Sequence, residues 1–403
     1  MKEWSSLVAV AVLSLALVVG VACGGDGEDE EEVQGIKYGV ALPMSGIFGA
    51  AVGLPAVHAS EVTRELLPEF TVAGERYRFD TIFEDNMFTG AGGVATATKF
   101  IYEDGVKIMT QAGPDPAGAA QTICEEAGVL MLTAASPPEL FGPDKPHTIQ
   151  TSPNYLTDTV VVLKYIAETY PEVKTIATAF ADSALGHSVG DPIIEAAPYF
   201  GLDVVSAEWP PMGVTEYYPL ATKLVHINPD IIFTDPQILK PMRELGYEGK
   251  NAYTNWTEGW AEFVGWDNYQ GAMVYQPNPY GEDMPPEAID YFAEIDRRFG
   301  DEPSQSSYLS GVMHSLLPQI MQKAGTVDDV DKMLEVIHSG EYFDTWLGPM
   351  RFGGEELIGI NNWMLWPGAV HEIRDHDYVL VYEMTADEAY DLACEVYGDL
   401  YLK

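Results

Sequence analysis

Cysteine and basic residues are the scarce residue types in this chain of 403 residues. Its three cysteines are too few for a disulfide framework, and their spacing fits no zinc knuckle. Only 21 lysines and arginines stand against 62 aspartates and glutamates, which gives a formal charge of −41. A chain this acidic does not hold nucleic acid or an anionic membrane by general electrostatics, so no nucleic-acid partner is expected. We interpret the acidic excess as surface charge that keeps the protein soluble.

Long hydrophobic runs are also missing, with one exception at the N-terminus. The run Leu7–Ala22 is too short for a comfortable transmembrane helix and has the length of a signal-peptide core. Small residues then precede Cys23, which resembles a bacterial lipobox, although Gly20 stands where leucine is usual. We therefore expect a signal peptide over residues 1–22, lipid on Cys23 and an acidic, flexible tether over 23–35. A plain secretory signal and an uncleaved anchor are the alternatives. The expected location is extracytoplasmic, at a membrane surface.

The rest of the chain alternates between apolar runs and helix-like segments. Four runs, "IKYGVAL", "YRFDTIF", "VKIMTQ" and "VLML", are typical of buried parallel strands. The pattern restarts after about residue 150, so the sequence predicts an α/β fold with two parallel-sheet domains. Three later helical segments, 286–299, 306–323 and 327–339, have no strands between them and must pack on sheets that already exist.

One short motif suggests catalysis. "GHSVG", residues 186–190, fits the G-x-S-x-G turn that exposes a nucleophilic serine in α/β-hydrolases. That turn must directly follow a strand, whereas the preceding strand ends near Phe180, so Ser188 falls in the first turn of a helix. We therefore predict that the protein is not an enzyme, and a secreted hydrolase using Ser188 stays as the alternative. The histidines of "HEIRDH", residues 371–376, are five apart and share no helix or strand face well, so no metal and no cofactor is expected.

Several segments, taken in order, resemble a known family. They are "IKYGVALPMSGIFG", "TKFIYEDGVKIMTQAGPDPAGAAQTICEEAGVLMLTAASPPEL", the stretch from "DSALGHSVGDPII" to "DIIFTD", and "LGPMRFGG". Over about residues 36–385 the chain resembles the extracellular solute-binding proteins of ABC importers with the type 1 periplasmic-binding fold, branched-chain amino acid (leucine-binding) class. The resemblance implies two Rossmann-like lobes joined by three hinge crossovers. Lobe 1 would contain residues 36–150 and about 277–340, and lobe 2 residues 151–276 and about 341–403.

The resemblance also implies a carboxylate-binding loop at "TAAS". Ala134, Ala135 and Ser136 would offer backbone N–H groups and one hydroxyl to the carboxylate of a ligand. Small residues suit this role because the backbone itself must approach the ligand. The alternative is an ordinary tight loop.

Other positions match the family's ligand site with changes. Asp115, in "GPDP", stands where the family commonly has serine, so it faces solvent or meets a cation of the ligand. Glu258 matches the acidic residue that pairs with the amino group of amino-acid ligands, or it is a carboxylate favoured in the first turn of a helix. Ala51 and Leu185 replace the usual tyrosines of the cleft, and Trp256 would supply the lost aromatic surface.

These expectations describe a lipid-anchored solute receptor. It would capture a small amino-acid-like or carboxylate-bearing solute by hinge closure and deliver it to an ABC permease, with ATP hydrolysed by separate ATPase subunits. A ligand sensor that reports to a signalling partner is the second alternative, after the hydrolase. Neither ligand identity nor a pairing of Cys124 with Cys394 can be read from the sequence.

Overall fold

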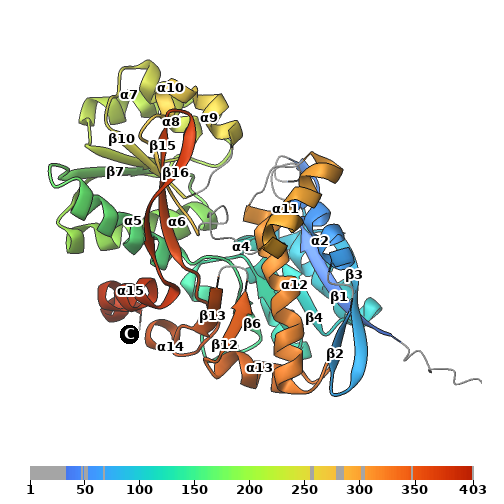
Figure 1. Ribbon diagram of the computed structural model, residues 1–403. Helices are drawn as coiled ribbons and strands as arrows, with labels where there is room; N and C mark the ends of the chain where they lie inside the picture. Colours follow the sequence, from blue (N-terminus) through green and yellow to red (C-terminus); the bar gives the residue numbers. More distant parts are fainter. Residues whose placement is uncertain are drawn as a thin grey trace, which may run out of the picture. The chain divides into compact units, whose positions relative to one another are not determined.

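The computed structural model describes residues 33–46, 49, 53–66, 69–254, 258–277, 286–300, 305–345 and 348–401. Within them the chain forms two sheets, each flanked by helices (Figure 1). Cys23, Ala51 and Trp256, and with them the signal peptide and most of the tether, lie outside the described residues.

The first sheet has nine strands in the order β12-β13-β14-β6-β5-β4-β1-β3-β2. The strands are β1 (Gln34–Leu42), β2 (Phe70–Val72), β3 (Glu75–Asp85), β4 (Ile108–Gln111), β5 (Leu130–Thr133), β6 (Thr148–Gln150), β12 (Tyr342–Thr345), β13 (Gly348–Gly353) and β14 (Trp363–Met364). The central strands β3, β1, β4, β5, β6 and β14 run parallel, whereas β2, β12 and β13 join by antiparallel pairing. The helical elements that follow or cover these strands are α2 (Leu54–Leu66), α3 (Gly90–Thr98), η2 (Lys99–Asp104), α4 (Pro114–Ala127), η3 (Pro138–Leu140), α11 (Pro286–Phe299), α12 (Gln305–Ala324), α13 (Val330–His338) and α14 (Glu355–Ile358).

The second sheet has seven strands in the order β16-β15-β11-β10-β9-β7-β8. They are β7 (Thr175–Ala179), β8 (Asp203–Glu208), β9 (Ile231–Thr234), β10 (Lys250–Tyr253), β11 (Met273–Tyr275), β15 (Gly368–Arg374) and β16 (Asp377–Met384). Strands β8, β7, β9, β10 and β11 are parallel, and the hairpin β15–β16 adds to β11 antiparallel. The helical elements of this part are α5 (Tyr155–Thr169), α6 (Ala184–Ala196), η4 (Ala197–Phe200), α7 (Tyr218–Ile227), α8 (Pro236–Glu244), α9 (Glu258–Val264), α10 (Trp266–Tyr269) and α15 (Ala386–Tyr401).

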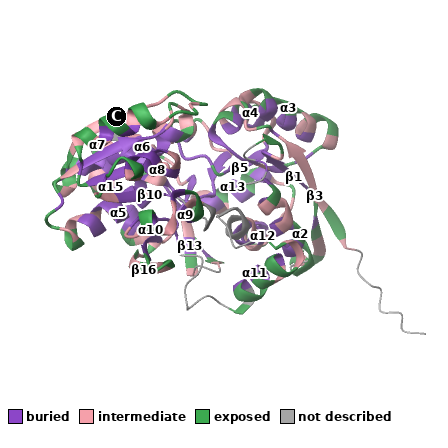
Figure 2. Cartoon of the chain, turned by 90° about the horizontal axis from the view of Figure 1, so that it is seen from above, coloured by how far each residue is buried: buried purple, intermediate pink, exposed green. Residues whose placement is uncertain are grey.

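Each sheet is covered by apolar helix faces, as parallel sheets require. On one face of the first sheet, side chains of α2, α11, α12 and α13 form a core with residues of β1 such as Tyr38 and Leu42. On its other face α3 and α4 pack around Phe100 and Met131. The second sheet is covered by α5, α6 and α15 in one cluster and by α7 and α8 in another. Figure 2 shows the central strands as mostly buried, whereas strands nearer the sheet edges, such as β3 and β16, and the outer helix faces are intermediate or exposed. We refer to the two sheets with their helices as lobe 1 and lobe 2.

Sheet membership corrects two predicted boundaries. The sequence assigned everything after about residue 340 to lobe 2, but β12, β13 and β14 belong to the sheet of lobe 1, where Trp363 of β14 pairs with Gln150 of β6. The last crossover therefore lies between Met364 and Gly368. These short strands carry no intervening long helix, so the sequence pattern could not tell which sheet they join. The body also begins earlier than predicted, because β1 starts at Gln34.

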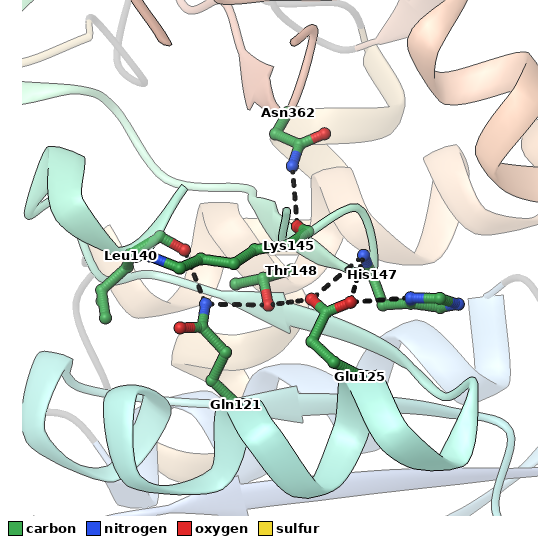
Figure 3. A network of polar contacts seen from close by, with 7 residues as sticks. All are labelled: Gln121, Glu125, Leu140, Lys145, His147, Thr148 and Asn362. Atoms are coloured by element: carbon green, nitrogen blue, oxygen red, sulfur yellow. Dashed lines mark hydrogen bonds and ion pairs between the residues drawn. The ribbon is translucent and has the colours of Figure 1, made fainter. Parts of the chain in front are cut away.

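Polar networks fix the lobe 1 segments that precede the first and the last crossover. Helix α4 and the turn before β6 form one of them, in which Glu125 accepts hydrogen bonds from the Thr148 hydroxyl at 2.9 Å and from the His147 backbone at 3.1 Å (Figure 3). The amide of Asn362, just before β14, donates to the Lys145 carbonyl at 3.1 Å. The Gln150 N–H donates to the Asn362 carbonyl at 2.8 Å, which ties the first crossover to the last.

Helix α15 is fastened to lobe 1 as well. Arg351 of β13 donates to Asp387 at 2.8 Å. The Tyr390 hydroxyl accepts from the Gly354 N–H at 2.8 Å and donates to Glu356 at 2.7 Å. Both described cysteines, Cys124 and Cys394, are free. No helix among the described residues combines the length and the apolar character that a membrane span needs.

Candidate ligand-binding site

The loop after β5 lies at the carboxyl edge of the lobe 1 sheet, where ligands of open α/β sheets bind. Ala134 is exposed, and neither its N–H nor that of Ser136 donates to an acceptor within the described part of the chain. The Ala135 N–H, by contrast, donates to the Thr133 hydroxyl at 3.0 Å. The loop thus offers two backbone donors instead of the three that were predicted.

The Ser136 hydroxyl forms hydrogen bonds within the protein. It donates to the Pro153 carbonyl at 3.3 Å and accepts from the Gln150 amide at 2.9 Å. Gln150 in turn accepts from Asn154, whose side chain caps α5 by accepting from the Leu156 N–H at 2.8 Å. Ser136 therefore links the loop to the first helix of lobe 2, as a residue of the hinge. Its hydroxyl already forms hydrogen bonds within the protein without a ligand.

The start of α4 is a poor place for an anion. Pro114 and Pro116 remove two of the N–H groups that a helix N-terminus would otherwise present. Asp115 lies between them, exposed, and adds a negative charge. Gly113 makes this turn with φ of 95°, and a Cβ there would meet the Phe88 ring at 2.5 Å. A ligand carboxylate is thus favoured at the loop after β5 and disfavoured at "GPDP".

A cavity of about 90 Å³ lies next to the loop, inside lobe 1. Its lining comes from β1, α2, β4, the loops after β5 and β6, and α12. The residues are Tyr38, Val40, Leu42, Ala56, Ser60, Thr110, Ala112, Ala134, Thr151, Ser310, Met313 and His314. Most are buried, while Ala134 is exposed and Thr110 and Ser310 are partly exposed, so the cavity reaches the surface beside the backbone donors.

The carboxyl edge of the lobe 2 sheet has a different character. Asp235 follows β9 and stands at the N-cap position of α8, yet its side chain makes no cap hydrogen bond. Instead the carboxylate accepts from the Tyr253 hydroxyl at the end of β10. Burial raises the pKa of Asp235 to about 6, and the Tyr253 hydrogen bond offsets only part of that rise.

Further acidic and phenolic groups surround Asp235. Asp158, in the first turn of α5, is buried, and the loss of hydration raises the pKa of its carboxyl well above the usual range. Burial raises the pKa of Tyr275, at the end of β11, well above its usual value, and the nearby Asp158, Tyr155 and Asp235 add to that rise. The Tyr275 hydroxyl has no hydrogen-bond partner among the described residues. We call Tyr155, Asp158, Asp235, Tyr253 and Tyr275 the acid–tyrosine cluster. Carboxyl groups held in so poorly hydrated a place favour a bound cation.

The remaining predicted site residues are placed as follows. Leu185 lies in the first turn of α6 with 36% of its surface exposed, and its contact with a ligand stays a prediction. Glu258 is the first residue of α9, which agrees with the alternative that it is a carboxylate in the first turn of a helix. Its side chain lies outside the described part. Whether Glu258 meets a ligand stays a prediction, as do the roles of Ala51 and Trp256.

Ser188 sits inside a helix. Helix α6 begins at Ala184, earlier than predicted, and Ser183 caps it by accepting from the Gly186 N–H at 3.0 Å. The Ser188 hydroxyl donates to the Leu185 carbonyl at 2.7 Å, a bond within the helix. The neighbouring His187 instead lies between Asp182 and Asp191, at 3.2 and 3.1 Å. A nucleophile elbow is absent at this position.

The sequence prediction missed His314, Asp235 and Tyr253. Asp235 and Tyr253 could have been found, because each is polar and ends an expected strand, "DIIFTD" or "NAYTN", at the ligand-binding edge. His314 gives no such signal, since it lies within the helical pattern of α12.

The chain crosses three times between two lobes with parallel sheets, and polar groups lie at the carboxyl edges of both sheets. This arrangement defines a two-lobed binding protein. A family model described as periplasmic binding protein matches residues 35–365, so the chain belongs to the periplasmic binding proteins. No curated protein matches the sequence.

Solved structures share the fold at low identity. A solute-binding protein of an ABC transporter from Rhodopseudomonas palustris BisB5, in complex with 3,4-dihydroxybenzoic acid, is 18% identical with a TM-score of 0.74, covering 87% of this chain and 98% of that one. A leucine-binding protein from Thermotoga maritima is 18% identical with a TM-score of 0.74, covering 88% and 99%. A solute-binding protein from R. palustris in complex with 4-hydroxybenzoate is 18% identical with a TM-score of 0.75, covering 87% and 97%.

Proposed function

We propose that this chain is the solute receptor of an ABC importer and captures a small organic solute that carries a carboxylate. The observation that carries the proposal is the pair of uncommitted N–H groups at Ala134 and Ser136, beside an exposed opening into lobe 1. Backbone N–H groups bind carboxylates by charge-assisted hydrogen bonds without bringing a counter-charge into the site.

Lobe 2 supports an amino group on the same solute. Asp158 and Asp235 lose hydration in the protein, and a ligand ammonium restores the interaction that water would have given. Tyr253 and Tyr275 add aromatic surface, which favours cations. An amino-acid-like solute would therefore present its two charges to different lobes.

The solute would act by shifting an open–closed equilibrium of the two lobes. A ligand that contacts both lobes binds the closed form more tightly and so increases its population. The closed form would then dock on a membrane permease, and a separate ATPase subunit would hydrolyse ATP. The three crossovers between the sheets are the segments that would bend.

The test is a thermal-shift screen of the purified body. It contains branched-chain and other amino acids, aromatic acids such as 3,4-dihydroxybenzoate and 4-hydroxybenzoate, short aliphatic acids, and the amide of each acid. A solute that binds only the folded state raises the melting temperature. We expect at least one acid to do so while its amide does not. Stabilisation by amides and acids alike would contradict carboxylate recognition.

The location is part of the proposal. Cys23 would carry lipid that holds the receptor at the outer side of the membrane. Cys23→Ser should release the protein from washed membranes or block its processing, as fractionation and immunoblotting would show, whereas Cys394→Ser should not. A Cys23→Ser variant that stays bound like the wild type would disprove the lipid anchor.

A further inference from the structure

The lobe 1 cavity runs from the carboxyl edge of the sheet into the space between the sheet and two helices. Tyr38, Val40 and Leu42 alternate along β1 and line one wall. Helices α2 and α12 form the opposite side, with Ala56 of α2 and Met313 of α12. Half of the lining residues are therefore aliphatic or methionine.

Most hydroxyl groups of the lining already form hydrogen bonds within the protein. Ser60 donates to the Ala56 carbonyl at 2.8 Å, and Thr151 donates to the Thr133 carbonyl at 3.3 Å. The hydroxyls of Tyr38 and Thr110 lie 2.5 Å apart and share one hydrogen bond. Since each hydroxyl has one proton and their bond uses only one of the two, one proton is left to donate to an oxygen in the cavity.

His314 supplies a matching acceptor. Its Nδ1 lies 2.8 Å from the Ser310 carbonyl, which can only accept, so Nδ1 carries the proton. Burial lowers the pKa of the ring, so His314 is neutral and Nε2 holds a lone pair. Nε2 has no hydrogen-bond partner among the described residues, although only 6% of the His314 surface is exposed. A buried acceptor without a donor is costly and rare in folded proteins, so a donor that reaches Nε2 from outside the chain would remove that cost.

Resting on the proposed function, we propose that this cavity is a specificity subsite that receives a short aliphatic group bearing a hydroxyl, at the end of the solute remote from its carboxylate. The ligand hydroxyl donates to His314 Nε2 and accepts the spare proton of the Tyr38–Thr110 pair. An ether lacks the donor, and an ammonium has no anionic partner in this lining. The apolar walls take the carbon atoms.

The size of the cavity restricts the group further. A cavity of about 90 Å³ has room for a small group of a few heavy atoms. A terminus such as a hydroxyethyl or secondary-alcohol group fits that space. An engineered cavity of about 150 Å³ is known to accommodate benzene, so an aromatic ring would require lobe 1 to open further.

The first arm of the test compares hydroxylated and plain acids by calorimetry. The pairs are 3-hydroxybutyrate with butyrate, 4-hydroxypentanoate with pentanoate, and 5-hydroxyhexanoate with hexanoate. For at least one pair we expect the wild type to bind the hydroxylated acid about ten- to a hundredfold more tightly, because the plain acid leaves Nε2 unpaired. His314→Leu should abolish or reverse that preference. His226→Leu, an exposed histidine on α7, is the matched control and should keep it.

Equal affinities within every pair in the wild type, or a preference that survives His314→Leu, would overturn the subsite while leaving carboxylate binding intact. The second arm does not depend on a carboxylate. In spectra of ¹⁵N-labelled histidine, 2-propanol should shift Nε2 of His314 saturably, and 2-methoxypropane, which lacks the donor, should not. Ala112→Leu, which fills the cavity, should remove the response.

The two arms separate the two proposals. If no acid binds but His314 responds to 2-propanol in this way, the proposed function fails and the hydroxyl subsite stands. If His314 gives the same response to the alcohol and the ether, or none to either, the subsite is wrong whatever the acids do.

Discussion

The two lobes share one fold plan but carry opposite chemistry at their ligand-binding edges. Lobe 1 presents backbone donors at Ala134 and Ser136 and a neutral imidazole in an apolar cavity. Lobe 2 presents the acid–tyrosine cluster, in which Asp158 and Asp235 hold raised pKa values. The shared fold therefore places a ligand-binding edge at the carboxyl ends of the strands in both lobes. The residues that follow each strand would then determine which end of a solute each lobe can bind.

The strongest way to break this comparison is to remove a carboxylate from lobe 2. For an amine-bearing solute, Asp235→Asn leaves the ligand charge without its buried partner, which costs about 3–5 kcal/mol. Calorimetry should show a loss of about two to four decades in affinity. Asp115→Asn, on the exposed turn of lobe 1, should change little or improve carboxylate binding. Loss of binding in Asp115→Asn but not in Asp235→Asn would place the cation site on lobe 1.

Glu258→Gln sharpens the comparison within lobe 2. If Glu258 pairs with the solute amine, as the family resemblance implies, its substitution should weaken amine binding by a similar two to four decades. If the acid–tyrosine cluster carries the cation alone, the loss should stay within about tenfold. Titrating both variants with the same amine solute distinguishes one shared site from a single dominant carboxylate, and unchanged affinity in both would exclude an amine on lobe 2.

The pH dependence of stability should also differ between the lobes. The folded pKa of Asp235 is about 6, above its usual 3.8, so the folded state binds a proton more tightly than the unfolded state. The protonated Asp235 therefore contributes about 3 kcal/mol to the free energy of unfolding. This contribution is fully present below about pH 4 and is lost as the pH rises toward 6. Without ligand, Asp235→Asn should lessen that fall in urea melts between pH 4 and 7. If the stabilities of Asp235→Asn and Asp115→Asn both depend on pH as that of the wild type does, the raised pKa of Asp235 would be contradicted.

The smallest expected effect is at Ser188. Its hydroxyl bonds only within α6, so Ser188→Ala should change stability by about 1 kcal/mol or less and leave ligand affinity unchanged. No ester hydrolysis should be present to lose. Ester turnover that disappears in the variant would show that lobe 2 carries a catalytic group after all.

The sequence predicted the alternation of strands and helices and the two sheets, because buried parallel strands and their covering helices have distinct patterns. It failed for β12, β13 and β14, whose sheet is chosen by tertiary pairing such as Trp363 with Gln150. It placed the loop Ala134–Ser136 directly after an expected strand, but it could not give the rotamer of Ser136, which depends on Gln150 and Pro153. The tautomer of His314 depends on a helix carbonyl that no periodicity reveals.

The most direct test of solute capture is calorimetry on the wild-type body with the best acid from the screen and with its methyl ester. The ester keeps the shape of the solute but loses the negative charge that the N–H groups of Ala134 and Ser136 would bind. We expect saturable binding of the acid and a loss of at least about a hundredfold for the ester, since hydrogen bonds to a charged group are worth about 1.5–3 kcal/mol each. Equal affinity for acid and ester, or no binding of any acid, would contradict the assignment of this chain as a carboxylate receptor.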